Sequence, residues 1–189
     1  MITAPPAGVG PAWQSWLGTV AVVLGVLLAA AHGTEWMKQR VIARATPVGA
    51  VFPAAECPED ELVEEGLSRA ECEQLVSNVR NYVVSAPAWF SGFQSVLAAT
   101  GTVLAVVSIG IGAALVDRRR WAPGAAVVVF AALAAVDAAG FVAALNTGPI
   151  LRDVYLWDAL VWFFLHFMLA IGAAAGMTAV GAETWTEGR

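Results

Sequence analysis

The sequence predicts an all-α, polytopic membrane protein, in which a four transmembrane helix bundle carries a small helical extramembrane cap. Composition is the first observation, because hydrophobic residues make up 59% of the 189 residues and charged residues only 13%, against roughly 25% charged residues in a soluble domain. The second is a set of four apolar stretches, each close to or above the about 20 residues that a helix needs to cross a bilayer. Helices also satisfy their own backbone hydrogen bonds inside lipid.

Tryptophans give the third observation, since seven of the eight stand at the ends of the apolar stretches: Trp13, Trp16, Trp36, Trp89, Trp121, Trp157 and Trp185. Indole rings concentrate in the headgroup layer because they combine an apolar body with one N–H donor. The tryptophans therefore mark where the spans begin and end. We expect one membrane domain over residues 1–189, with spans at approximately 14–34, 88–116, 122–145 and 156–182.

The first connection, residues 35–87, predicts an extramembrane loop with two short helices. Pro58 and the carboxylates that follow it are typical of the first turn of a helix, and Gly66 is well placed to end that helix. Ser68-Arg69-Ala70-Glu71 has the form of a capping box at the start of a second helix. Pro87 ends this second helix just before the second span.

Both cysteines of the chain, Cys57 and Cys72, lie in this loop. An even pair in one extramembrane segment favours a structural disulfide on an oxidising face. A redox-active thiol pair is the alternative, but the spacing differs from the Cys-x-x-Cys form that such chemistry favours. Two cysteines are too few for a structural zinc site, and we predict no metal site.

The turn between the second and third spans is the most basic segment of the chain and contains Arg118, Arg119 and Arg120. The positive-inside rule places this turn and both termini in the cytoplasm. The large loop also carries basic residues, so the cysteine pair decides between the two orientations. We expect an integral protein of a bacterial inner membrane, with the 35–87 loop on the outer face.

Small residues predict close helix packing, because helices in lipid associate through close approach rather than through a hydrophobic drive. Gly172 and Gly176 form a GxxxG element in the fourth span, and Ser108 with Gly112 forms a weaker small-xxx-small pair in the second. Packing within the bundle is the expected role of the GxxxG element, and self-association is the alternative.

Ionisable residues inside the membrane are the strongest functional candidates, because each costs several kcal/mol unless it is paired or hydrated. Asp137 in the third span and His166 in the fourth lie roughly 12–14 Å from the same membrane face at ~1.5 Å per residue, so they can meet. The other polar candidates fall in the same half of the bilayer, under the large loop: Asp158, Gln94, His32 and Glu35.

Two interpretations of this polar cluster stay open. Asp137 and His166 can form a polar clamp between two helices, with no ligand. Alternatively, the cluster lines a pocket for a quinone headgroup, a haem, a lipid headgroup or a proton relay, since a carboxylate fixes the tautomer of a neighbouring imidazole and stabilises its charged form. His32 and His166 would then be the axial ligands of a haem.

The layout is similar to that of claudin-like tetraspan proteins, which have a large disulfide-bearing first outer loop and a tight basic inner turn. The loop lacks the Trp…Gly-Leu-Trp…Cys…Cys pattern of claudins, so the resemblance carries over no residue and no function. Quinone-linked four-helix thiol oxidases are similar in span count, but their Cys-x-x-Cys is missing here.

No Walker A loop, GxSxG elbow or HExxH motif occurs in the sequence, so we predict no catalytic residues. The net charge of −5 and the lack of a basic surface argue against a nucleic-acid partner. We therefore expect a non-catalytic accessory or assembly subunit, whose partners are the lipid bilayer and other membrane subunits or further copies of itself. The competing hypothesis is a membrane redox or ligand-binding protein that uses the polar cluster.

Overall fold

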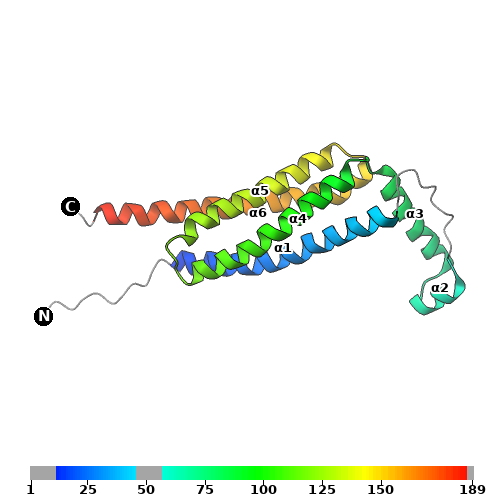
Figure 1. Cartoon of the computed structure of the whole chain (residues 1–189), viewed down its shortest axis with the longest axis horizontal. Helices are drawn as coiled ribbons and strands as arrows, with labels where there is room; N and C mark the ends of the chain where they lie inside the picture. Colours follow the sequence, from blue (N-terminus) through cyan, green and yellow to red (C-terminus); the bar gives the residue numbers. More distant parts are fainter. Residues whose placement is uncertain (1–11, 46–56, 187–189) are drawn as a thin grey trace.

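The computed structural model describes residues 12–45 and 57–186, and every element in these ranges is a helix. The six helices are α1 (Ala12–Ala45), α2 (Glu59–Glu65), α3 (Arg69–Ser85), α4 (Phe90–Val116), α5 (Ala122–Leu145) and α6 (Pro149–Thr186). Helices α1, α4, α5 and α6 run along one another as an elongated bundle, and α2 and α3 lie at one end of it (Figure 1). The expected all-α class is confirmed.

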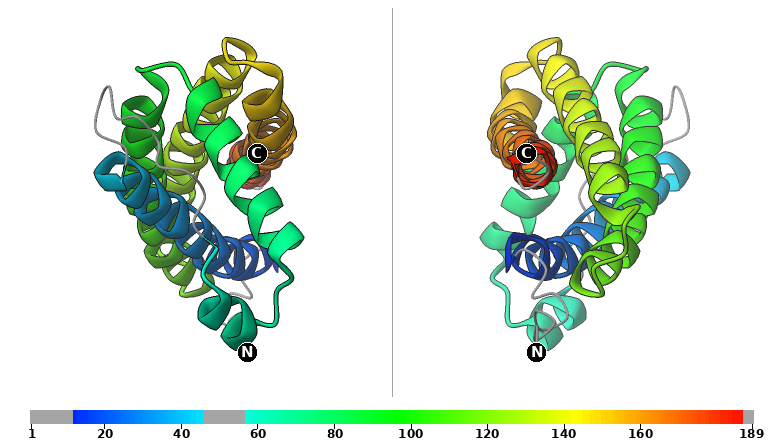
Figure 2. Two further views of the ribbon diagram at one scale, coloured as in Figure 1. Left: turned by 90° about the vertical axis from the view of Figure 1, so that its right-hand side faces the viewer. Right: turned by 90° about the vertical axis from the view of Figure 1, so that its left-hand side faces the viewer.

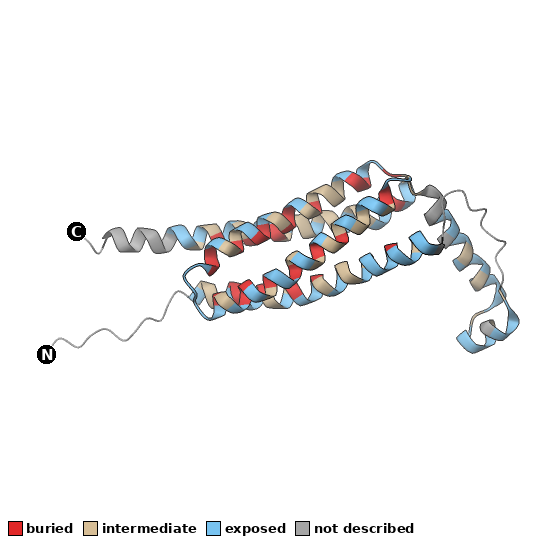
Figure 3. Cartoon of the chain, viewed as in Figure 1, coloured by how far each residue is buried: buried red, intermediate tan, exposed pale blue. Residues whose placement is uncertain are grey.

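Four helices are long and apolar enough to cross a membrane. The most apolar windows of α1, α4, α5 and α6 have mean hydropathies of 1.9, 2.1, 2.3 and 1.9, and no more than 33% of any window is buried inside the chain. The buried residues follow the inner faces of these helices, while their outer faces are exposed (Figure 3). An apolar outer surface of this extent suits contact with lipid, so the expectation of four helices able to span a membrane is confirmed.

The four long helices pack as two extensive pairs, α1 with α4 and α5 with α6. A smaller contact between α4 and α5 joins the pairs, whereas α1 and α6 meet over only a few residues. Figure 2 shows the resulting arrangement, with α1 and α6 at its two open edges. We call the sparsely packed line between these two helices the α1–α6 seam.

The two ends of the bundle differ. The start of α1, the turn between α4 and α5 and the end of α6 lie together at one end, here the turn end (Figure 1). The other end, here the cap end, carries the turn between α5 and α6 together with α2 and α3, which form the cap. Helix α3 also touches α6, so the cap rests on the bundle.

Two helices are longer than the expected spans. Helix α1 continues past residue 34 to Ala45, because residues 35–45 include Lys, Gln and Arg, which favour helix, and contain no glycine or proline to stop it. Helix α6 begins at Pro149 rather than near residue 156, since proline suits the first helical position. The first part of the expected 35–87 loop is therefore helical; residues 46–56 lie outside the described ranges.

The main apolar core lies in the half of the bundle nearest the turn end. Its most buried members are Leu115, Ala122, Ala126, Leu133 and Ala173. Helices α1 and α4 come into backbone contact beside this core, where a Cβ atom on Gly112 would lie 2.7 Å from the carbonyl oxygen of Gly18. The small-residue pair expected at Ser108 and Gly112 thus marks a real helix approach, since both residues are buried against α1.

The expected packing role of the GxxxG element is only half correct within this chain. Gly176 packs against the indole ring of Trp13, whose atoms would lie 2.6 Å from an added Cβ. Gly172 has no neighbouring side chain or helix within 4 Å of the Cβ position, so it does not pack within the bundle. The physical reason is that Gly172 lies on the exposed outer face of α6, although the neighbouring Ala173 is fully buried in the core; beyond these residues the end of α6 extends past the other helices (Figure 1).

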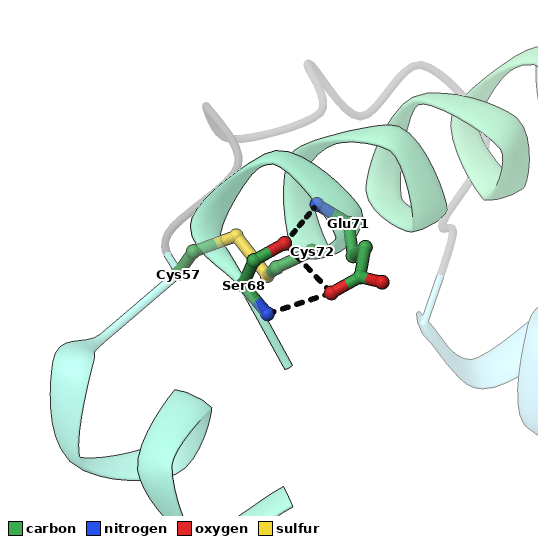
Figure 4. Close-up of a disulfide and its surroundings, with 4 residues drawn as sticks. All are labelled: Cys57, Ser68, Glu71 and Cys72. Atoms are coloured by element: carbon green, nitrogen blue, oxygen red, sulfur yellow. Dashed lines mark hydrogen bonds between the residues drawn. A yellow bond between two sulfur atoms is a disulfide. The ribbon is translucent and has the colours of Figure 1, made fainter. Parts of the chain in front are cut away.

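The cap has the two short helices and the cross-link that the sequence predicts. Gly66 ends α2 in a left-handed conformation with φ of 67°, which glycine adopts without steric cost. Cys57 and Cys72 form a disulfide, with 6.2 Å between their Cα atoms (Figure 4). At the start of α3, the backbone N–H of Ser68 donates to the Glu71 carboxylate at 2.8 Å and the backbone N–H of Glu71 donates to the Ser68 hydroxyl at 3.3 Å, as a capping box requires. The Ser68 hydroxyl also donates to the carboxylate at 2.6 Å.

Removing the disulfide should loosen the cap and leave the bundle intact. The bridge spans a sequence separation of 15 residues, for which loop closure contributes about 3 kcal/mol. In the double variant Cys57→Ser/Cys72→Ser we expect backbone amides of α2 and α3 to exchange with deuterium at least tenfold faster, while those of α4 and α5 keep their rates. Unchanged exchange in the cap would show that its packing, not the bridge, orders it.

The capping box makes the start of α3 sensitive to acid. Hydrogen bonds from the Ser68 hydroxyl and backbone N–H lower the pKa of Glu71 below its usual value. Because the folded-state pKa is lowered, this stabilisation is complete above the usual glutamate pKa and is lost as pH falls through the lowered one. We expect Ser68→Ala to raise the pKa of Glu71, measured by NMR titration of its carboxyl carbon; an unchanged pKa would contradict the assigned cause.

Candidate functional site

Asp137 of α5 and His166 of α6 form a buried pair between the two helices. The Nδ1 atom of His166 lies 2.6 Å from Oδ2 of Asp137, and the exposed fractions of the two side chains are 1% and 5%. The Trp162 ring, one turn from His166, stacks on the imidazole with 5.8 Å between ring centroids. The expectation that the two residues meet at one depth is confirmed.

The hydrogen bond to Asp137 uses only one of the two ring nitrogens of His166. With Asp137 ionised, Nδ1–H of His166 donates to Oδ2, and a neutral imidazole then has a free lone pair on Nε2. The Nε2 atom of His166 is buried and has no hydrogen-bond partner within the described residues. Buried polar atoms nearly always have a hydrogen-bond partner. A structural clamp between the helices does not require an unpaired Nε2 atom beside the Asp137 carboxylate.

A cavity of about 180 Å³ lies beside the pair and is enclosed by side chains of all four spanning helices. Its walls include the polar residues expected from the sequence together with one further tyrosine: His32, Glu35, Gln94, Asp137, Asp158 and Tyr155. The remaining lining is small or apolar, with the Trp162 ring as its one large aromatic surface besides Tyr155. The structure thus brings five of the expected polar residues to one cavity, while His166 lies behind Asp137.

Several polar groups at this cavity have no partner. Gln94 is half-buried and Asp158 is exposed, and neither side chain makes a hydrogen bond or ion pair within the described part of the chain. The Nε2 atom of His32 is buried and equally unpaired among these residues. Convergence of unpaired polar groups on one cavity is typical of a binding site, because a ligand can supply the missing hydrogen bonds.

His32 is held at the cavity by a glycine. A Cβ atom on Gly101 of α4 would lie 2.8 Å from three atoms of the His32 ring, so the imidazole packs directly on the α4 backbone. Asp137 and His166 both interact electrostatically with His32. Asp137 and His166 therefore lie near His32.

A second polar cluster bridges the α1–α6 seam at the cap end. The Tyr155 hydroxyl of α6 donates to Glu35 Oε1 of α1 at 2.7 Å, and Gln39 Nε2 donates to the same oxygen at 2.7 Å. Lys38 Nζ lies 2.8 Å from Glu35 Oε2, and the Ser91 hydroxyl donates to Gln39 Oε1 at 3.0 Å. We call these five residues the seam cluster; two of them, Glu35 and Tyr155, line the cavity.

Sequence reasoning missed the seam cluster apart from Glu35. Hydropathy places Tyr155 in the connection before the fourth span, which it predicts to start near residue 156, and places Gln39 in the extramembrane loop. A signal was present in the spacing of Glu35 and Gln39, one helical turn apart and directly after an apolar span. No group of three or more His, Cys, Asp or Glu side chains is placed to hold a metal ion within residues 12–45 and 57–186.

Comparisons with known proteins give no match of any kind: no family model, no curated protein and no solved structure is similar to this chain.

Proposed function

We propose that the protein binds the polar headgroup of a small, membrane-soluble molecule in the cavity beside Asp137 and His166. One observation carries this proposal: unpaired polar groups of Gln94, Asp158 and His32 converge on a cavity inside a membrane bundle. A polar clamp alone needs only the Asp137–His166 hydrogen bond and neither a cavity nor further unpaired groups. Orienting polar groups in an otherwise apolar pocket is the usual design of a ligand site.

The size of the cavity selects among the ligands that the sequence suggested. At about 180 Å³ it is smaller than the roughly 300–1,000 Å³ of pockets that enclose drug-sized ligands. A single-ring headgroup such as that of a quinone suits this volume, whereas a haem macrocycle does not. His32 therefore serves the proposed site as a hydrogen-bonding group and His166 as the residue that orients Asp137, rather than the two as axial haem ligands.

Charge argues against a phosphate headgroup. Three carboxylates line the cavity, those of Glu35, Asp137 and Asp158. One of them, Glu35, is already paired with Lys38, and Asp137 with His166. Among the described residues no lysine or arginine lines the cavity, so a phosphate would meet uncompensated negative charge.

The α1–α6 seam supplies a route for an apolar tail. Between the seam cluster and the contact of Trp13 with Gly176, α1 and α6 meet over only a few residues, so we place here the exit into the bilayer of a chain attached to the headgroup. This route favours a lipid-soluble ligand over a water-soluble one.

We further propose the orientation expected from the sequence, with the Arg118–Arg120 turn in the cytoplasm of a bacterial inner membrane. Support comes from the positive-inside rule and from the Cys57–Cys72 bridge, which suits an oxidising compartment at the cap end. The cavity is then reached from the outer half of the bilayer.

The accessory or assembly role stays a prediction. Gly172 supports it, since this residue lies open on α6 and can admit a second membrane helix. A stoichiometric protein partner after purification from the native membrane would favour this role over ligand binding.

The test uses two matched glycine variants of α5. Gly140 lines the cavity, where an added Cβ makes only ordinary contacts at 3.8 Å, and Gly124 has nothing within 4 Å. We expect wild-type protein and Gly124→Leu, purified from the native membrane in mild detergent, to carry one small molecule detectable by mass spectrometry after solvent extraction. Gly140→Leu, which fills the cavity, should carry less than a tenth as much. Equal yields in all three proteins would contradict the proposed site.

A further inference from the structure

We propose that the cavity selects a headgroup that donates hydrogen bonds, and specifically a quinol in preference to the corresponding quinone. This inference rests on the proposed function and names the chemical class of its ligand. A quinol offers two hydroxyl donors, whereas the quinone of the same ring offers two carbonyl acceptors.

The cavity wall is rich in acceptors. Ionised Asp158 can accept through both oxygens and makes no hydrogen bond within the described residues. Asp137 uses Oδ2 for His166, and no hydrogen bond to its Oδ1 occurs in that part of the chain. Carboxylate oxygens only accept, so these positions can be satisfied only by donors.

Few donors face them. The Tyr155 hydroxyl donates to Glu35, which leaves the amide of Gln94 and the indole N–H of Trp162 as the side-chain donors of the cavity wall that make no hydrogen bond within the described residues. The imidazole of His32 contributes a donor or an acceptor according to its tautomer. A quinone carbonyl would therefore face carboxylate oxygens at most positions, and a buried acceptor left unpaired is costly.

A site built to hydrogen-bond a hydroxyl discriminates strongly against an analogue that lacks it, because its own polar groups are then left unpaired. The aromatic ring is common to both redox forms, so stacking on Trp162 does not distinguish them. Discrimination between quinol and quinone therefore measures the hydrogen-bonding character of the cavity alone.

The experiment compares decylubiquinol and decylubiquinone as ligands of the purified, detergent-solubilised full chain under nitrogen, with dissociation constants from isothermal titration. We expect the quinol to bind at least tenfold more tightly. Asp158→Asn replaces an acceptor-only group by one that also donates, and Asp158 is exposed and makes no hydrogen bond or ion pair within the described residues. In this variant the preference should fall to less than threefold.

Equal binding of both forms, or tighter binding of the quinone, would overturn the donor inference and leave the proposed function standing. If neither form binds, and Gly140→Leu carries as much extracted small molecule as Gly124→Leu does, the proposed function fails and this inference fails with it.

Discussion

Replacing Asp137 by alanine should destabilise the bundle by about 3 kcal/mol, because it leaves a buried imidazole without its charged partner. Both side chains of the pair are almost fully buried, so little solvent screening reduces this cost. The loss is expected with or without a ligand, since the hydrogen bond between Asp137 and His166 joins α5 to α6. The free energy of unfolding in detergent, from denaturant titration followed by circular dichroism, measures it.

Asp137→Asn is the matched control. Its amide oxygen can still accept from Nδ1–H of His166, so we expect less than half of the loss seen with alanine. If Asp137→Ala were as stable as the parent protein, the pair would not join the helices, and the account of this site would be wrong.

A leucine at Gly112 should separate α1 from α4 and cost about 3 kcal/mol, the upper end of the range for overpacking. An added Cβ would lie 2.7 Å from the carbonyl oxygen of Gly18 and 2.9 Å from Val22. Backbone atoms cannot rotate away as a flexible side chain can, so the helices themselves must move. The shift in thermal unfolding temperature of Gly112→Leu, compared with the parent protein, measures the effect.

Gly110→Leu makes the same change on the same helix at a position with nothing within 4 Å. We expect it to be as stable as the parent or slightly more stable, because leucine favours helix over glycine. Equal destabilisation of both variants would show that glycine at these positions serves something other than the approach of α1 to α4.

The depth of the polar residues could be predicted from the sequence. A helix advances by a fixed rise, so counting from the span ends placed Asp137 and His166 at one level. The structure then brings their atoms to 2.6 Å. The capping box and the disulfide were predictable for a different reason: each depends on residues that lie close together in the chain.

The rest depends on long-range packing that no local pattern specifies. Gly18 meets Gly112 because of how α1 and α4 cross, and Tyr155 meets Glu35 because α6 begins earlier than its hydropathy indicates. The open position of Gly172 could not be predicted either, since the GxxxG spacing does not reveal whether a helix lies opposite.

The two halves of the bundle have different interiors. Near the turn end, small and aliphatic residues such as Leu115, Ala122 and Ala126 fill the interior completely. Near the cap end, polar side chains enclose a cavity instead. Close packing in one half can hold the helices in register while the other half remains open for a ligand.

The reactivity of an introduced cysteine can show whether the cavity binds a ligand. Both native cysteines are bonded to each other and do not interfere. Ala159 lines the cavity, whereas Ala126 is fully buried in the apolar core. We predict that Ala159→Cys in native-membrane vesicles stripped of quinones reacts with N-ethylmaleimide, that decylubiquinol slows this reaction at least tenfold, and that Ala126→Cys does not react. Failure of Ala159→Cys to react, or reaction at a rate that the quinol leaves unchanged, would contradict a ligand-binding cavity in this membrane protein.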